Sequence, residues 1–137
     1  MRMLTFVLAI WLSSNCFAER KPTATPLRKI IAQPERFDKS MVKVSGFLVF
    51  EVQSRHAPLV LLFPSETDAK QHRNAVLVEA NQEILDSRSR LGERCLTLVA
   101  IVHAVPTASG AYVPVLKATT RFALQNGTPP GQCGDED

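Results

Sequence analysis

The clearest pattern in the chain is an alternation of apolar positions that begins near Met41. Every second residue then falls on one face, and that face carries Val42, Val44, Gly46, Leu48 and Phe50. A period of two predicts a β-strand with one buried face. The central glycine predicts a bend or bulge, the device by which a small barrel turns one strand through two sheets.

Three short helices are predicted from apolar residues at helical spacing and from capping residues. The first covers residues 27–32, with Thr25 as its N-cap. The second covers residues 65–70. The third begins after Asn81 and ends at Gly92.

Apolar runs between turn residues predict four further strands, at residues 59–63, 75–79, 94–105 and 112–124. Five strands with a helix between strands 3 and 4 is the order of the OB-fold, a partly open Greek-key barrel. A β-sandwich of six or seven strands needs more spaced turn signals than the chain contains. We therefore expect a mostly β protein: a five-stranded OB-fold-like Greek-key barrel with a short N-terminal helix and a helix between strands 3 and 4.

The first eighteen residues predict an export signal. Arg2 supplies a positive start, residues 4–12 form an apolar run, and Cys16-Phe17-Ala18 ends in a small residue. The run is about half of the roughly 20 residues that a spanning helix needs. We expect cleavage after Ala18, a periplasmic or secreted mature protein, and no transmembrane segment after cleavage. An uncleaved anchor is the alternative.

The three cysteines are predicted to have different fates. Asn15 and Ser13 do not fit the positions before a lipid-modified cysteine, so Cys16 leaves with the signal, although a lipid anchor stays open. In an oxidising compartment the remaining pair, Cys95 and Cys133, predicts one disulfide. The alternative is a buried free thiol at Cys95 and an unattached Cys133.

Beyond the signal, the chain is predicted to form one domain between two polar ends. Residues 19–26 contain two prolines and predict a linker, residues 27–125 form the OB-like barrel domain, and residues 126–137 form a C-terminal tail. The formal net charge of +3 includes Arg2 and falls to +2 after cleavage. That charge is too small to imply a nucleic-acid partner by itself.

Two segments contain recognisable motifs. Pro34-Glu35-Arg36-Phe37 is a Pro-x-x-aromatic turn after a short helix, and Val42-Lys43-Val44-Ser45-Gly46 is a Val-x-Val-x-Gly strand. Leu91-Gly92-Glu93-Arg94 enters a later apolar strand through a glycine turn. In these features the chain resembles small exported bacterial OB-fold-like proteins of largely unknown function. The resemblance implies architecture, and it implies no substrate or catalytic residue.

Candidate chemistry is sparse. The histidines form no His-x-x-x-His pair, and no Cys-x-x-Cys pair, Gly-x-Ser-x-Gly elbow or glycine-rich phosphate loop occurs. We therefore expect no enzyme activity, no metal site and no cofactor. A possible ligand loop for a small molecule or an envelope glycan is formed by Arg55, His56, Lys70, His72 and Arg73.

Nucleic acid is a common ligand of OB-folds, which offer aromatic platforms on strands 2 and 3 within a basic groove. Here Phe63 is the single aromatic residue on those two predicted strands. Lys117 and Arg121 share a face of the fifth strand and Lys43 lies on the first, which gives a possible but small basic face. We expect no specific nucleic-acid binding.

Strands 2 and 4 carry apolar residues on both faces, whereas a barrel interior needs only one. Val60 and Leu62, or Val99 and Ile101, must therefore be covered from outside. The cover is either the first predicted helix or a partner. The sequence thus favours an exported non-enzymatic binding module that acts through protein contact on its barrel face. The alternative is a small-ligand or envelope-glycan binding protein that uses the loops between residues 55 and 73.

Overall fold

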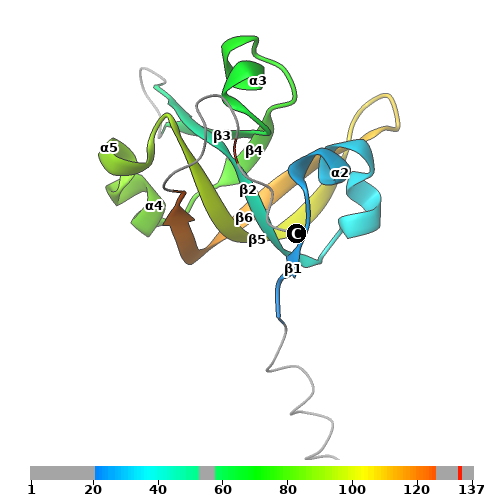
Figure 1. Cartoon of the computed structure of the whole chain (residues 1–137). Helices are drawn as coiled ribbons and strands as arrows, with labels where there is room; N and C mark the ends of the chain where they lie inside the picture. Colours follow the sequence, from blue (N-terminus) through cyan, green and yellow to red (C-terminus); the bar gives the residue numbers. More distant parts are fainter. Residues whose placement is uncertain (1–20, 53–57, 126–132, 134–137) are drawn as a thin grey trace, which may run out of the picture.

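The computed structural model describes residues 21–52, residues 58–125 and Cys133 (Figure 1). The predicted export signal at residues 1–18 lies outside this part of the chain, as does the predicted tail apart from Cys133. None of the helices in the described part has both the length and the apolar character needed to cross a membrane.

Five strands close into a barrel (Figure 1). They are β2 (Met41–Glu51), β3 (Leu59–Phe63), β4 (Val76–Glu79), β5 (Arg94–Pro106) and β6 (Tyr112–Leu124). Neighbours run in the order β2–β3–β4–β6–β5, and β5 pairs again with β2. The pairing of β4 with β6 is parallel, and the others in the barrel are antiparallel. This closed order confirms the predicted OB-fold-like barrel.

β2 serves both sides of the barrel, and Gly46 is where it approaches β3 most closely. Residues up to Leu48 pair with β5, and residues from Phe47 onward pair with β3. A Cβ atom at Gly46 would lie 2.7 Å from the carbonyl oxygen of Phe63 and 2.7 Å from Cγ of Leu62. No side chain fits at such distances, so the strand needs glycine where it changes partner.

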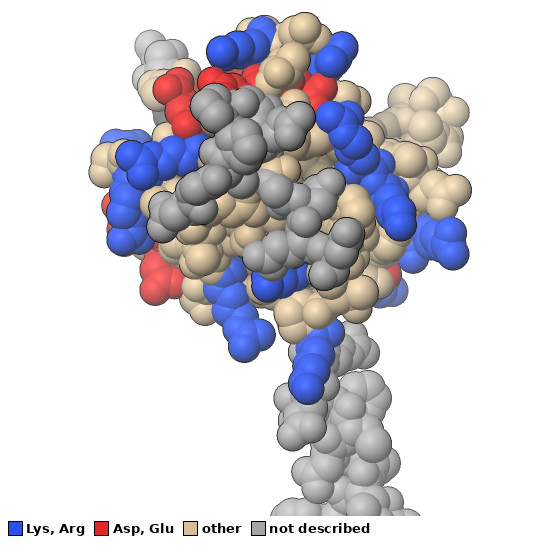
Figure 2. All heavy atoms as spheres, viewed as in Figure 1, with Lys and Arg blue, Asp and Glu red and all other residues tan. Residues whose placement is uncertain are grey.

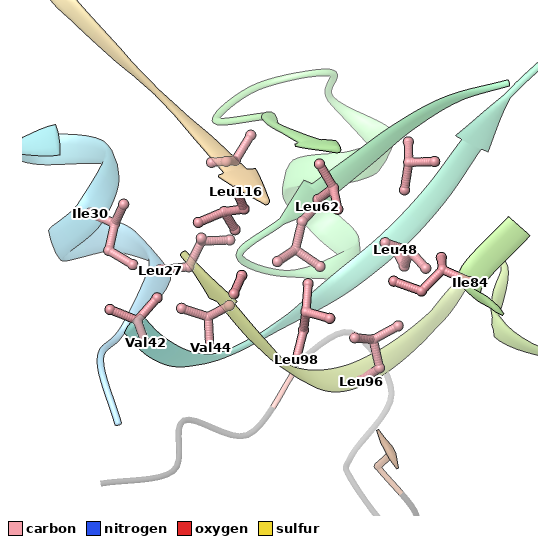
Figure 3. Close-up of a cluster of buried hydrophobic side chains, with 14 of the residues drawn as sticks. Leu27, Ile30, Val42, Val44, Leu48, Leu62, Ile84, Leu96, Leu98 and Leu116 are labelled. Atoms are coloured by element: carbon pink, nitrogen blue, oxygen red, sulfur yellow. The ribbon is translucent and has the colours of Figure 1, made fainter. Parts of the chain in front are cut away.

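Helix α2 (Leu27–Ala32) forms at the predicted residues, and it closes one end of the barrel. Its side chains Leu27 and Ile30 are 2% and 0% exposed, and they join the core beside Val42 and Leu116 (Figure 3). The 3-10 helix η2 (Pro34–Phe37) follows. The first predicted helix therefore supplies core residues rather than only a cover.

The segment before α2 differs from the prediction. Its N-cap is Pro26, and the predicted cap Thr25 is wrong because the Thr25 hydroxyl donates to the carbonyl oxygen of Thr23 at 3.0 Å instead. Within the predicted linker, β1 (Thr23–Ala24) pairs in parallel with β2. Backbone pairing thus starts earlier than the two prolines suggest.

Two helices close the other end, where a single helix was predicted. They are α4 (Gln82–Asp86) and α5 (Arg88–Leu91). The predicted cap is confirmed, because Asn81 Oδ1 accepts from the Ile84 backbone N–H at 3.0 Å. The chain leaves helical geometry at Ser87, which lets both Ile84 and Leu91 reach the core.

The predicted outward position of Val60 and Leu62 is wrong. Both side chains belong to the barrel core, with 3% and 0% exposure. β3 is apolar at every position, so its sequence gives no alternation, and pairing with β2 decides which face points inward. On β5, Leu98 and Ala100 lie in the core, which leaves Val99 on the outer side as predicted.

The predicted disulfide is confirmed. Cys95 and Cys133 are bonded across a sequence separation of 38, with a Cα–Cα distance of 5.3 Å. Cys95 lies next to Thr97 on the outer side of β5, where the hydroxyls of Ser45 and Thr97 lie 3.2 Å apart. The Gln125 amide donates to both of these oxygens, at 2.9 Å and 3.1 Å. The bond therefore holds Cys133 against the outer wall of the barrel.

Candidate functional site

The β5–β6 hairpin extends beyond the closed part of the barrel (Figure 1). β5 and β6 have 13 residues each, whereas β4 has four and pairs with β6 only as far as Val115. Beyond that point Val105 pairs with Val113, and Pro106 pairs with Tyr112. At the end of the hairpin, β5 and β6 thus pair with each other and with no other described strand.

Large apolar side chains are exposed on this extension. Val105 is 41% exposed and Val113 is 46% exposed, on the same side of the hairpin. Leu77, 37% exposed, continues this side onto β4 through its register partner Val115. We call Leu77, Val105, Val113 and Val115 the hairpin patch. Tyr112, 47% exposed, lies at its edge on the opposite side of the strand.

The hairpin patch is free of charge. No Asp, Glu, Lys or Arg occurs between Ala104 and Leu116 in the sequence. Along β4 and β6 the next charges are the register partners Glu79 and Lys117, and the Asp38 carboxylate lies at the base of the hairpin, bonded to the Ala104 backbone. Depletion of charge with enrichment of aromatic residues is typical of the buried centre of protein interfaces.

The hairpin is braced by hydrogen bonds at its turn and at its base. At its turn, the backbone N–H and the hydroxyl of Thr107 both donate to the carbonyl oxygen of Ala111, at 2.7 Å and 2.9 Å. Gly110 adopts a φ of 85°, which favours glycine. At its base, the Asp38 carboxylate accepts from the Ala104 backbone N–H at 2.9 Å. A partner would therefore meet a preformed surface.

The structure places the predicted basic face on the outer wall. Lys43 is the register partner of Val99, and Lys117 is the register partner of Ile101. Arg121 follows on β6, beyond an irregularity in its pairing with β5. These cations border an apolar strip on β5 and no aromatic platform.

The predicted ligand loop is described in part. Arg55 and His56 lie outside the described residues. Lys70 forms a 3.4 Å ion pair with Glu66, and Arg73 donates to Asp68. His72 has a φ of 51° and is exposed. Lys70 and Arg73 are thus already engaged with carboxylates of their own loop.

Sequence reasoning missed a buried carboxylate beneath this loop. Asp68, on α3 (Glu66–Lys70), is 1% exposed. Its Oδ2 accepts from Arg28 and from the Ser65 hydroxyl, each at 2.9 Å. Its Oδ1 accepts from Arg73 at 2.8 Å and from the Asn74 amide at 3.3 Å. This cluster ties α2 to the loop between β3 and β4.

These contacts control the ionisation of Asp68. Burial by itself raises the pKa of its carboxyl. The hydrogen bonds, led by that from Arg73, and the charge of Arg28 outweigh burial, so this pKa lies below its ordinary value of 3.8. The carboxylate is therefore a permanently charged structural anchor at neutral pH. Within the described residues, His, Cys, Asp and Glu side chains form no group of three or more that could hold a metal ion.

No protein-family model matches the sequence, and no curated protein matches it. One solved structure to which the chain is similar is described as a "putative aspartyl-tRNA synthetase from Leishmania major Friedlin", with a TM-score of 0.45 and 12% identity. The likeness covers 79% of this chain and 21% of that chain, so this chain spans about a fifth of that protein. The assignment of the fold rests on the strand pairings above.

Proposed function

We propose that this protein is an exported, non-enzymatic binding module that holds a partner protein on the hairpin patch. The observation that carries the proposal is a preformed hairpin that exposes apolar side chains without any charge. Contiguous apolar patches on the surface of a protein often mark a site of protein contact. The proposal involves no chemical step.

The occupant is an apolar segment of another protein, rather than a second copy of this chain. The exposed parts of the hairpin patch amount to roughly 200–250 Å², which is a small patch for a protein surface. A stable interface between two copies needs about 800 Å² on each partner. The patch therefore suits a small, reversible contact.

A photo-cross-linking amino acid in place of Val113 is expected to capture one partner protein in the compartment to which the chain is exported. The same amino acid in place of Val52 is the matched control, because Val52 is 89% exposed but follows β2, away from the hairpin. With the purified partner, Val113→Glu should weaken binding at least about tenfold, because it places an unpaired charge in an apolar contact. Val52→Glu should leave the affinity unchanged.

Both variants should keep the melting temperature, because substitutions of exposed side chains usually change stability by about 0.5 kcal/mol or less. An adduct with a second copy of this chain would contradict the proposal. Equal adducts at both positions, or none at either, would do so as well.

Export forms part of the same proposal, and the Cys95–Cys133 disulfide is consistent with an oxidising compartment. The protein recovered from the cell envelope or medium is expected to begin at Glu19. Intact-mass spectrometry measures this directly. A chain that retains Met1, or one that carries a lipid on Cys16, would show that the export signal was misread.

A further inference from the structure

A hollow of about 430 Å³ lies between β1, α2 and η2. It forms because Gln33 alone joins the two helices, and its backbone leaves helical geometry before the buried Pro34 begins η2. The volume falls in the range of roughly 300–1,000 Å³ that is typical of small-molecule pockets. The hollow is formed by elements other than the hairpin and the predicted ligand loop.

The charged residues that line this hollow are both positive. Lys29 comes from α2 and Arg36 from η2, and Glu35, although on η2, does not line it. Neither cation forms an ion pair within the described residues. Arg36 Nη1 donates to Gln33 Oε1 at 3.4 Å, which occupies one of the five N–H donors of a guanidinium.

On the face shown in Figure 2, Lys and Arg side chains lie on the side that carries α2 as well as elsewhere around the outline, whereas Asp and Glu side chains gather mainly near α3. An anion that approaches α2 therefore meets a favourable potential, which salt would screen.

The remaining wall combines the polar residues Thr25 and Gln33 with apolar residues. Pro26 and Ala32 line it, together with the ring of Phe37, which is partly buried against the barrel core. A few polar groups that fix orientation within an apolar wall is the usual composition of a ligand site. We infer that this hollow binds a small organic anion. Its carboxylate or phosphate group pairs with Lys29 and Arg36, and its apolar body lies against Phe37.

The test is an NMR titration of isotope-labelled protein with phenylacetate and, separately, phenyl phosphate. Either probe should shift the backbone amides of Thr25, Ala32 and Gln33 with roughly millimolar affinity, as expected for ligands of about ten heavy atoms. Preference between the two probes identifies the acidic group. Phenethyl alcohol, which has the same ring without the charge, should bind at least about fivefold more weakly.

The double variant Lys29→Gln, Arg36→Gln should lose at least about tenfold in affinity for the preferred probe. Arg88→Gln is the matched control, because Arg88 is an exposed cation on α5 at the other end of the barrel. The inference is overturned if neither anion shifts these amides at about 20 mM, which is roughly 20 times the expected dissociation constant. It is equally overturned if the neutral probe binds as well, or if the double variant binds as tightly as the control.

Discussion

A chain that begins at Gln33 is expected to lose about 5 kcal/mol of its free energy of unfolding and to be largely unfolded at 37 °C. The deletion removes Leu27 and Ile30 from the core, and each fully buried aliphatic side chain stabilises the fold by roughly 1.5–3 kcal/mol. It also removes the pairing of β1 with β2 and the bond from Arg28 to Asp68. A domain of this size has only about 5–15 kcal/mol in total.

Urea unfolding followed by circular dichroism measures the loss, and two point variants show where it comes from. Ile30→Ala should cost about 3–4 kcal/mol, because Ile30 is 0% exposed and its removal leaves a cavity. Ile31→Ala should cost about 1 kcal/mol, because the Ile31 side chain is only partly buried against the core. Equal costs for both variants, or an unchanged melting temperature after truncation, would show that α2 does not stabilise the barrel by closing its end.

The barrel could be predicted from sequence where alternation and turn signals were unambiguous. The period of two in β2 assigned the inward face correctly, since Val42, Val44 and Leu48 are all in the core. On β3 every position is apolar, so the inward face depends on hydrogen-bond register with β2, which no local pattern contains. The same limit explains why Val60 and Leu62 were assigned to the wrong side.

The position of the hairpin patch could have been predicted from two sequence features, strand length and local absence of charge. Two predicted strands near thirteen residues rise roughly 3.3 Å per residue and so outreach a partner of four or five residues, which means that their ends must project. The run from Ala104 to Leu116 without charge lies at those ends. Strand length together with local charge therefore directs attention to the hairpin patch, whereas fold analogy names no site.

The Asp68 cluster and the α2–η2 hollow were beyond reach of sequence reasoning for a different reason. Ser65-x-x-Asp68 predicts a capped helix, and the Asp68 backbone N–H does donate to Ser65 Oγ at 3.1 Å. The partner Arg28, however, is 40 residues away, and a buried acid has the same local sequence as an exposed one. Likewise, the hollow depends on the backbone angle at Gln33, which residue spacing does not encode.

The buried carboxylate leads to the second large expected effect. Asp68→Asn should lower the free energy of unfolding at pH 7 by about 3 kcal/mol, because it removes the charge that four donors were arranged to meet. The cost lies at the lower end of the range for buried ion pairs, since the side chains of Arg28 and Arg73 are 65% and 59% exposed and can be solvated when released. Glu66→Gln is the matched control on the same helix. Its 3.4 Å pair with Lys70 is a surface contact worth about 0.3–0.5 kcal/mol.

The pH dependence of stability in the wild type and in Asp68→Asn distinguishes a loss of charge interactions from a loss of packing. The folded pKa of Asp68 is lowered, so its stabilisation is fully present above the ordinary value of 3.8 and is lost as the pH falls through the folded pKa. Other carboxyl groups titrate in the same range, but they are common to the wild type and the variant. The difference in unfolding free energy between wild type and Asp68→Asn should therefore be constant from pH 7 to about pH 5 and narrow below about pH 4. Urea titrations at pH 7, 5, 4 and 3 measure it, and a difference that does not change with pH would show that Asp68 stabilises the fold through shape rather than charge.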